Sequence, residues 1–286
     1  MKLYFVPARS RHSYPMSLTA YAQFYALLER HVGIQLDHSK QYLADSRLDS
    51  LAKSLGYSDV ALFIQFLIRT PVGHLHWNAF EALTTNETYF FRDKQVFDVL
   101  SQNVLPQLVE AKRSERSMRI YCAAASTGQE VFSLMMLMRE LLPILSGWDM
   151  FIQASDISQA CIERARQGIY TSKEVERGLP PEYLIKYFEK LPDGSFQISS
   201  VLRELVHFSR LNLLDEPDNY PKFDLILLRN VLIYFGNDTK VRILKNIHKQ
   251  LARDSGLLVL GATESLFLHR NFQPVQYGKV SLYSAV

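Results

Sequence analysis

The stretch Arg119-Ile-Tyr-Cys-Ala-Ala-Ala-Ser-Thr-Gly-Gln-Glu-Val-Phe-Ser-Leu-Met-Met136 decides the expected fold. Residues 120–124 form a short apolar run, Ser126-Thr-Gly128 predicts a turn, and the apolar positions after Glu130 follow a helical period. Strand, tight turn and helix open a βαβ unit, whose helix N-terminus faces a ligand-binding crevice. We expect Gly128 to let the backbone approach a ligand and Glu130 to place a carboxylate at the crevice. An ordinary βα turn is the alternative, because one glycine is a weak fingerprint and G-x-G-x-x-G is absent.

Length and composition indicate a folded protein without a disulfide framework. The 286 residues fit one large domain or a core with a smaller second domain, and 48% are hydrophobic and 21% charged. A net charge of +3 is too weak to argue for nucleic-acid binding. The two cysteines, Cys122 and Cys161, are too few for a disulfide framework. Because neither a signal peptide nor a membrane-length apolar run is found, we expect a cytoplasmic protein without direct membrane insertion.

The N-terminal third of the chain has the pattern of helices only. Residues 1–15 are basic, contain prolines and show no period, so we expect a flexible arm there. Residues 16–83 are expected to form a small helical domain. Within it, Asp37 and Ser58 are candidate helix caps. The apolar residues expected in the helix after Ser58 are Leu62, Phe63, Phe66 and Leu67.

Two basic residues of this helical domain stand seven positions apart. Lys40 and Arg47 would project from the same side of one helix, two turns from each other. The simplest interpretation is a solvated helix surface.

The domain junction and the end of the second strand both carry polar residues. Residues 84–93 are dense in hydrogen-bonding and aromatic side chains, unlike a plain solvated linker. Residues 150–155 predict a second strand that ends at Asp156. An acid at this place, more than 20 residues beyond the first turn, is suited to bind ribose hydroxyls.

The remaining segments predict a mostly parallel sheet with a small insertion. Residues 171–205 interrupt the alternation with turn signals and are expected to contain an antiparallel hairpin. Strands are then expected at residues 206–213, 223–228 and 257–260, followed by a closing hairpin over 272–277 and 280–283. A mostly parallel sheet with a terminal antiparallel hairpin resembles class I S-adenosylmethionine methyltransferases rather than dinucleotide dehydrogenases.

Three motifs occur in order along the chain: Thr84-Thr-Asn-Glu-Thr-Tyr-Phe-Phe-Arg-Asp93, Ser126-Thr-Gly-Gln-Glu130 and Arg229-Asn-Val-Leu-Ile-Tyr-Phe235. Together they resemble the CheR-type chemotaxis receptor methyltransferases, and the resemblance covers nearly the whole chain. It implies an α/β, Rossmann-like class I methyltransferase domain at residues 94–286, with a β-subdomain inserted at about residues 171–205. The small all-α domain would precede it, joined by the junction motif.

The activity that the resemblance implies is methylation of glutamate side chains on the cytoplasmic helices of chemoreceptors, as in sensory adaptation. Glutamate has a reference pKa of about 4.3 and is already ionised at neutral pH, so the reaction needs no general base. The cofactor would be S-adenosyl-L-methionine and the product S-adenosyl-L-homocysteine. We expect no metal site and no nucleic-acid partner. The protein would act as a monomer on the cytoplasmic domain of methyl-accepting chemotaxis receptors.

Similarity to the family also suggests roles for individual residues. Arg92 and Tyr234 would be catalytic, with Arg92 pairing a carboxylate of the cofactor and Tyr234 facing the transferred methyl or orienting the glutamate. A buried structural tyrosine is the alternative for Tyr234. Lys40 and Arg47 match the receptor-facing helix of the family, where a positive face meets acidic receptor helices. The cofactor-binding residues would be Asn86, Thr88, Arg92, Glu130, Asp156, Asn212, Leu213, Arg229 and Asn230.

The chain also departs from the pattern of the family. Ser50 stands where many relatives carry an arginine, so the basic patch is thinner. Gly261-Ala-Thr-Glu264 stands where Gly-His-Ser-Glu is common, which puts the rim of the site in doubt. The predicted hairpin around Pro192-Asp-Gly194 lacks the extra glycines of relatives that grip a receptor tail, so we expect no such tether.

Three other functions compete with this interpretation. A non-catalytic S-adenosylmethionine-binding adaptor would keep the fold without methyl transfer, although Arg92 and Tyr234 are intact. A methyltransferase acting on RNA or a small molecule is disfavoured because the Asn-Pro-Pro-Tyr-like motif of amino-group methylation is missing. A nicotinamide dehydrogenase is disfavoured by the missing glycines and by the closing hairpin.

Overall fold

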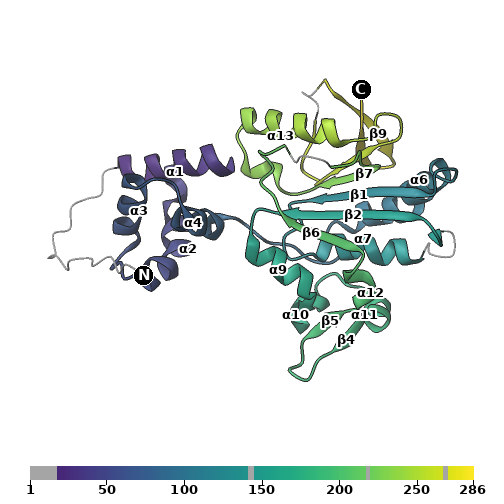
Figure 1. Ribbon diagram of the computed structural model, residues 1–286, viewed down its shortest axis with the longest axis horizontal. Helices are drawn as coiled ribbons and strands as arrows, with labels where there is room; N and C mark the ends of the chain where they lie inside the picture. The colour runs from purple at the N-terminus through teal and green to yellow at the C-terminus, as the bar shows by residue number, and fades with distance from the viewer. Residues whose placement is uncertain (1–17, 141–144, 217–219, 267–269) are drawn as a thin grey trace. The chain divides into compact units, whose positions relative to one another are not determined.

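The computed structural model describes residues 18–140, 145–216, 220–266 and 270–286, which separate into two compact units (Figure 1). Within the described residues, one unit comprises 18–31 and 36–83, and the other comprises 32–35 and the chain from Thr84 onward. The arm predicted for residues 1–15 lies outside the described residues. No helix of the described residues is long and apolar enough to cross a membrane.

The first unit consists of helices only. They are α1 (Leu18–Val32, whose last residue belongs to the second unit), the 3-10 turn η1 (His38–Lys40), α2 (Gln41–Ser54), α3 (Val60–Arg69) and α4 (His74–Leu83). Asp37 caps η1, as its side chain accepts from the Ser39 amide at 2.8 Å. Phe24 and Phe80 meet inside the unit with ring centroids 5.9 Å apart.

The sequence places Leu62, Phe63, Phe66 and Leu67 in α3 correctly, but the expected cap is wrong. Asp59, not Ser58, caps the helix, because its carboxylate accepts from the Leu62 amide at 2.9 Å. Within the helix Phe63 is buried, whereas Leu62 and Phe66 are exposed. The buried stripe therefore consists of Val60, Phe63, Ile64 and Leu67.

The second unit is built on a seven-stranded sheet in the order β6-β2-β1-β7-β8-β10-β9. The first five of these strands run parallel to one another, and β10 runs antiparallel to both β8 and β9. The strands are β1 (Ser117–Ala123), β2 (Asp149–Asp156), β6 (Val206–Arg210), β7 (Leu225–Leu228), β8 (Leu257–Leu260), β9 (Phe272–Tyr277) and β10 (Val280–Ala285). The predicted fold class, a mostly parallel sheet closed by an antiparallel hairpin, is confirmed.

Helices cover both faces of this sheet. Figure 1 shows α13 (Asn237–Gln250) on one side, and α7 (Gln129–Glu140) and α9 (Gln159–Gln167) on the other. The segment before β1 is a single helical run made of α5 (Lys94–Val99), the π-helical turn η2 (Leu100–Val104) and α6 (Leu105–Ala111).

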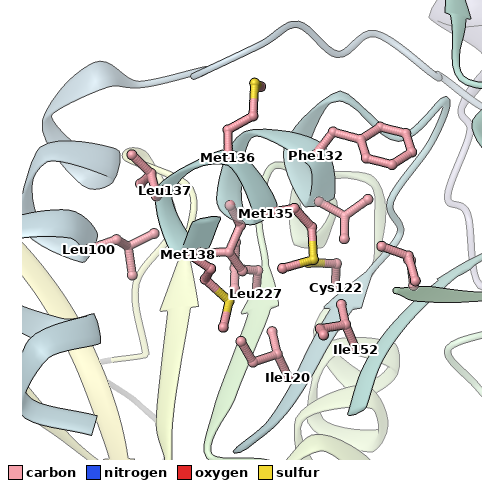
Figure 2. Packing of buried hydrophobic residues seen from close by; sticks show 14 of the residues in the cluster. Leu100, Ile120, Cys122, Phe132, Met135, Met136, Leu137, Met138, Ile152 and Leu227 are labelled. Carbon is pink, nitrogen blue, oxygen red and sulfur yellow. The ribbon is translucent and has the colours of Figure 1, made fainter. Parts of the chain in front are cut away.

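The core lies between α7 and the central strands, because both present continuous apolar runs. Figure 2 shows Met135 of α7 above Cys122 and Ile120 of β1, with Leu227 of β7 and Ile152 of β2 beside them. The sheet is buried on both faces at these strands, which explains why their sequences do not alternate.

The insertion is larger than the hairpin that the turn signals predict. Strands β4 (Phe188–Lys190) and β5 (Phe196–Ile198) do pair antiparallel, and β3 (Ile169–Tyr170) adds a third strand. Three short helices complete the subdomain: α10 (Ser172–Glu176), α11 (Pro181–Tyr187) and α12 (Ser200–Arg203).

Candidate active site

A cavity opens at the carboxyl edge of the parallel strands, entirely within the second unit. It encloses about 850 Å³ between its walls, part of which is open solvent. Strands β1, β2, β6 and β7 all run into it, and strand order reverses at β1, where open α/β sheets bind ligands. All ten residues predicted for the cofactor and for catalysis line it: Asn86, Thr88, Arg92, Glu130, Asp156, Asn212, Leu213, Arg229, Asn230 and Tyr234.

The loop after β1 joins three segments beneath the cavity. Ala124 and Ser126 both adopt positive φ, 56° and 50°, so the chain turns sharply at the strand end. The Ser126 amide donates to Asp156 Oδ2 at 2.8 Å, and its hydroxyl donates to the Asn86 carbonyl at 2.8 Å. The other oxygen of Asp156 accepts from the Ser158 amide at 2.9 Å. Asp156 is therefore held rigidly by backbone amides at the point where the sequence predicts a ribose-binding acid.

Gly128 has a role other than the one expected from the sequence. Its φ is 95°, and an added Cβ would lie 3.0 Å from both Ala165 Cβ and Phe132 Cε2, and 3.2 Å from the Tyr170 hydroxyl. Gly128 is not among the described residues that line the cavity. The glycine allows close packing of the loop against α9 and β3, and the expectation that it approaches a ligand is not supported.

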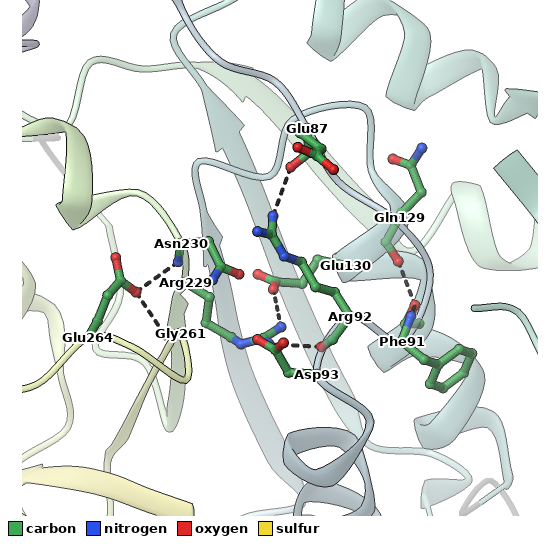
Figure 3. A network of polar contacts seen from close by, with 11 residues as sticks. Glu87, Phe91, Arg92, Asp93, Gln129, Glu130, Arg229, Asn230, Gly261 and Glu264 are labelled. Atoms are coloured by element: carbon green, nitrogen blue, oxygen red, sulfur yellow. Dashed lines mark hydrogen bonds and ion pairs between the residues drawn. The ribbon is translucent and has the colours of Figure 1, made fainter. Parts of the chain in front are cut away.

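A buried charge cluster lies under the cavity, centred on Arg229 (Figure 3). The Arg229 side chain is fully buried, and its guanidinium pairs with Glu130 at 2.6 Å and with Asp93 at 2.8 Å. It also donates to the Arg92 carbonyl at 2.8 Å. Burial raises the pKa of Glu130, and the charge of Arg229 opposes that rise. Arg229 thus fixes Glu130 and the end of the junction motif in place.

The junction motif reaches the cavity through a strained backbone. Phe91 and Asp93 have φ of 51° and 61°, in the left-handed region. The Phe91 amide donates to Ser133 Oγ at 2.9 Å, which anchors this bend to α7. Between them, the Arg92 guanidinium donates to the Glu87 carbonyl at 2.9 Å and lines the cavity. Since a guanidinium carries five N–H donors, Arg92 keeps donors for a carboxylate ligand.

Tyr234 and Asn230 lie on one turn after β7. Asn230 has a φ of 56°, and a 3-10 turn, η3 (Leu232–Tyr234), follows. The Tyr234 carbonyl accepts from the Gln35 amide at 3.0 Å, which ties this turn to the segment 32–35 of the same unit. The Tyr234 side chain is half-buried, and its hydroxyl forms no hydrogen bond with any of the described residues.

The apolar part of the cavity comes from two places. Leu213 lies after β6, and the Asn212 side chain beside it accepts from the Leu214 amide at 3.1 Å, which shapes the turn. Val32 and Ile34 add a second apolar wall that the sequence did not suggest, because the helical period of α1 gives no sign that its end reaches this cavity.

The two predicted receptor-binding residues lie in the helical unit in different settings. Lys40 is exposed on η1 rather than on α2. Arg47 is half-buried, and its guanidinium donates to the Leu83 carbonyl at 2.7 Å. Arg47 therefore has a structural contact that the sequence pattern did not reveal.

Comparison with known families divides the chain in the same region as the two units. Residues 19–84 match the CheR methyltransferase all-alpha domain, and residues 86–280 match the CheR methyltransferase SAM binding domain. S-adenosylmethionine is therefore the cofactor, and the chain is a methyltransferase.

Named relatives match over almost their whole lengths. Chemotaxis protein methyltransferase 1 of Pseudomonas aeruginosa is 40% identical over 92% of this chain and 96% of its own. Chemotaxis protein methyltransferase Cher2 of Pseudomonas putida is 36% identical over 93% of this chain and 97% of its own. Chemotaxis protein methyltransferase of Borreliella burgdorferi is 35% identical over 86% of this chain and 89% of its own length. With its cavity, its motifs and these relatives, the chain belongs to the CheR family of chemotaxis methyltransferases.

Proposed function

We propose that this protein transfers the methyl group of S-adenosylmethionine to glutamate side chains of chemoreceptors, forming methyl esters. The acceptor carboxylate oxygen forms a bond to the methyl carbon, the bond from that carbon to sulfur breaks, and its electron pair stays on sulfur. No proton is transferred, because the acceptor is already ionised at neutral pH. The products are a neutral ester and S-adenosylhomocysteine.

The observation that carries this proposal is the lack of a free general base at the cavity. Among the described residues that line it there is no histidine, lysine or cysteine. The three lining carboxylates are engaged: Glu87 with Arg177 at 2.7 Å, Glu130 with Arg229, and Asp156 with backbone amides. An amine or alcohol acceptor would need a base to remove its proton, whereas a carboxylate acceptor does not.

The cavity residues suit the parts of the cofactor. We propose that Arg92 binds the carboxylate of its methionine end through the free donors of its guanidinium. Asn86, Thr88 and Asn230 would contact the same end. Their hydrogen-bonding groups come from the junction motif and from the turn after β7.

The adenosine end would be held on the other side of the cavity. We propose that Asp156 accepts from the ribose hydroxyls, since its carboxylate lines the cavity and is oriented there by the amides of Ser126 and Ser158. Asn212 and Leu213 would flank the adenine. Glu130, oriented by Arg229, would contribute a second acceptor on this side.

Tyr234 would act at the reacting atoms. Its half-buried ring lines the cavity beside Asn230, where it can orient the incoming glutamate and help to exclude water. We expect Tyr234→Phe to keep the affinity for S-adenosylhomocysteine within about threefold and to lower kcat by roughly 10-fold or more.

The deciding experiment is methyl transfer from labelled cofactor to purified receptor cytoplasmic fragments. We expect alkali-labile label on the receptor glutamates, and we expect this label to be lost when those glutamates are replaced by alanine. Label that resists alkali, or label on RNA, would indicate another acceptor. Binding of S-adenosylhomocysteine without any transfer would indicate a non-catalytic adaptor.

Arg92→Lys should weaken cofactor binding although it keeps the charge, because lysine lacks the planar guanidinium that can bind a carboxylate with two parallel hydrogen bonds.

We further propose that the helical unit contacts acidic receptor helices and that the protein acts as a monomer in the cytoplasm. Lys40 supports the receptor contact, because it is an exposed cation of the helical unit. Lys40→Glu should raise the receptor KM, with a matched control in Lys53→Glu, because Lys53 is already paired with Asp49 at 2.8 Å. Arg47→Gln should act mainly on stability, since its guanidinium is bonded to Leu83. Light scattering should give a mass near 33.0 kDa.

A further inference from the structure

The turn that carries Asn230 and Tyr234 is held by a carboxylate from a distant segment. Glu264 lies after β8, at the end of a turn closed by its own amide, which donates to the Gly261 carbonyl at 2.9 Å. One carboxylate oxygen accepts from the amides of Asn230 and Gly261, both at 2.8 Å. The other accepts from Val231 at 3.0 Å and Leu232 at 2.8 Å. Figure 3 shows this carboxylate facing Asn230 and Gly261.

These amides need an acceptor from outside their own segment. Asn230 has left-handed φ and η3 begins at Leu232, so the amides of residues 230–232 point the same way and find no acceptor within the turn. Successive amides of this kind form a concave anion-binding nest. An ionised carboxylate fills it with charge-assisted hydrogen bonds.

Close approach of the two segments is also built into the chain. A Cβ at Gly261 would lie 2.6 Å from Asn230 Nδ2, 2.7 Å from the Glu264 carboxylate and 2.9 Å from the Asn230 amide. Only glycine leaves room for the turn after β8 to lie this near to the turn after β7.

We propose that Glu264 is a positioning residue for methyl transfer, because it sets the conformation of the turn that presents Asn230 and Tyr234 to the cavity. Asn230, Val231 and Tyr234 line the cavity, and Glu264 is not among the described residues that do so. Its effect on the reaction must therefore pass through the backbone. The inference rests on the proposed function for the roles of Asn230 and Tyr234.

The test compares Glu264→Gln with a matched control in another part of the sheet. The amide keeps the size of the side chain, but its NH2 group would face two N–H donors. Asp224 is also a buried carboxylate, accepting from the Arg119 amide at 2.9 Å and pairing with Lys112 at 3.1 Å. Asp224 directly precedes β7, at the end of the strand opposite the cavity. Asp224→Asn is therefore expected to cost stability alone.

Both variants are measured at a temperature where circular dichroism shows them folded. For Glu264→Gln we expect the Kd of S-adenosylhomocysteine by calorimetry to rise about 10-fold, through Asn230. We expect kcat at saturating cofactor and receptor to fall roughly 10- to 100-fold, through Tyr234. Asp224→Asn should show a lowered Tm with Kd and kcat within about twofold of wild type. Glu264→Asp keeps the charge on a shorter side chain and should recover part of the cofactor affinity and part of kcat. It replaces Glu264→Gln in the comparison if the Gln variant does not fold.

Several results would overturn the inference. If Glu264→Gln keeps the wild-type Kd and kcat while its Tm falls as in Asp224→Asn, the residue is merely structural. If Glu264→Asp is as impaired as Glu264→Gln, charge at this place does not position the turn. Failure of the wild-type protein to form alkali-labile esters would count against the proposed function instead, and the calorimetric comparison would still decide whether Glu264 orders the cofactor site.

Discussion

Replacing Arg229 by methionine gives the sharpest test of how the site is held together. The change keeps an unbranched apolar stem but removes the guanidinium and its charge, so that Glu130 and Asp93 both lose their shared partner. Arg229 is 0% exposed, and Glu130 and Asp93 are 12% and 28% exposed. Breaking a buried ion pair by removing one partner costs about 3–5 kcal/mol. Because Asp93 is partly solvated, we expect the low end, about 3 kcal/mol.

The loss should be visible in equilibrium unfolding by urea. A cost of about 3 kcal/mol lowers the Tm by roughly 6–12 °C for a domain of this size. The control is Arg229→Met combined with Glu130→Gln, which no longer leaves Glu130 charged and unpaired. The double variant should lose less unfolding free energy than the two single variants lose together, with a coupling energy of about 1–3 kcal/mol. If Arg229→Met unfolds at the same urea midpoint as the wild-type protein, the reasoning is refuted.

The same variant has a pH signature with a definite sign. Burial raises the pKa of Glu130, and Arg229 lowers it, so removing Arg229 should raise this pKa further. A carboxyl whose pKa is raised in the folded state contributes stability below its unfolded pKa of about 4.3. It loses this contribution as the pH rises through the folded pKa. The stability gap between wild type and Arg229→Met should therefore widen from acid toward neutral pH. A gap that narrows would contradict the assignment of Glu130 as the stranded charge.

Three further predictions concern local contacts elsewhere in the second unit. Gly128→Ala should lower the free energy of unfolding in urea by about 1–3 kcal/mol, because φ is 95° and the new Cβ would lie 3.0 Å from atoms of Ala165 and Phe132. An unchanged urea midpoint would contradict the close packing at this glycine. Arg177→Gln should cost less than about 1 kcal/mol, as its 2.7 Å pair with Glu87 is 54% and 60% exposed, and added salt should erase the difference. Thr171→Ala should lower the free energy of unfolding by about 1 kcal/mol, since the Thr171 side chain forms a capping box with Glu174. Thr171→Ser keeps the capping hydroxyl and should therefore unfold thermally near the wild-type Tm.

Much of the fold could be predicted because local patterns report the backbone directly. The apolar run of β1, the turn after it and the period of α7 lie within one stretch of sequence, and the structure has all three. Errors arose where two local signals compete. Ser58 and Asp59 are neighbouring residues of types that both cap helices well, and the structure uses Asp59.

The candidate site could be predicted as a set of residues, and the ten predicted side chains do line one cavity. Their functional roles remain predictions. What the motifs could not reveal is which polar groups bind each other. Arg229 stands 99 residues from Glu130 and 136 from Asp93, and nothing in either motif indicates their pairing.

The sequence by itself determined the class of fold, the family and the residues gathered at the sheet edge, because periodicity and motifs act over a few residues. Only the tertiary structure decided that Gly128 serves packing, that Arg229 is a buried support and that Glu264 holds the turn of Tyr234. The physical reason is that burial and hydrogen bonding depend on distance in space. Segments that lie far apart in the chain meet only when the sheet has assembled.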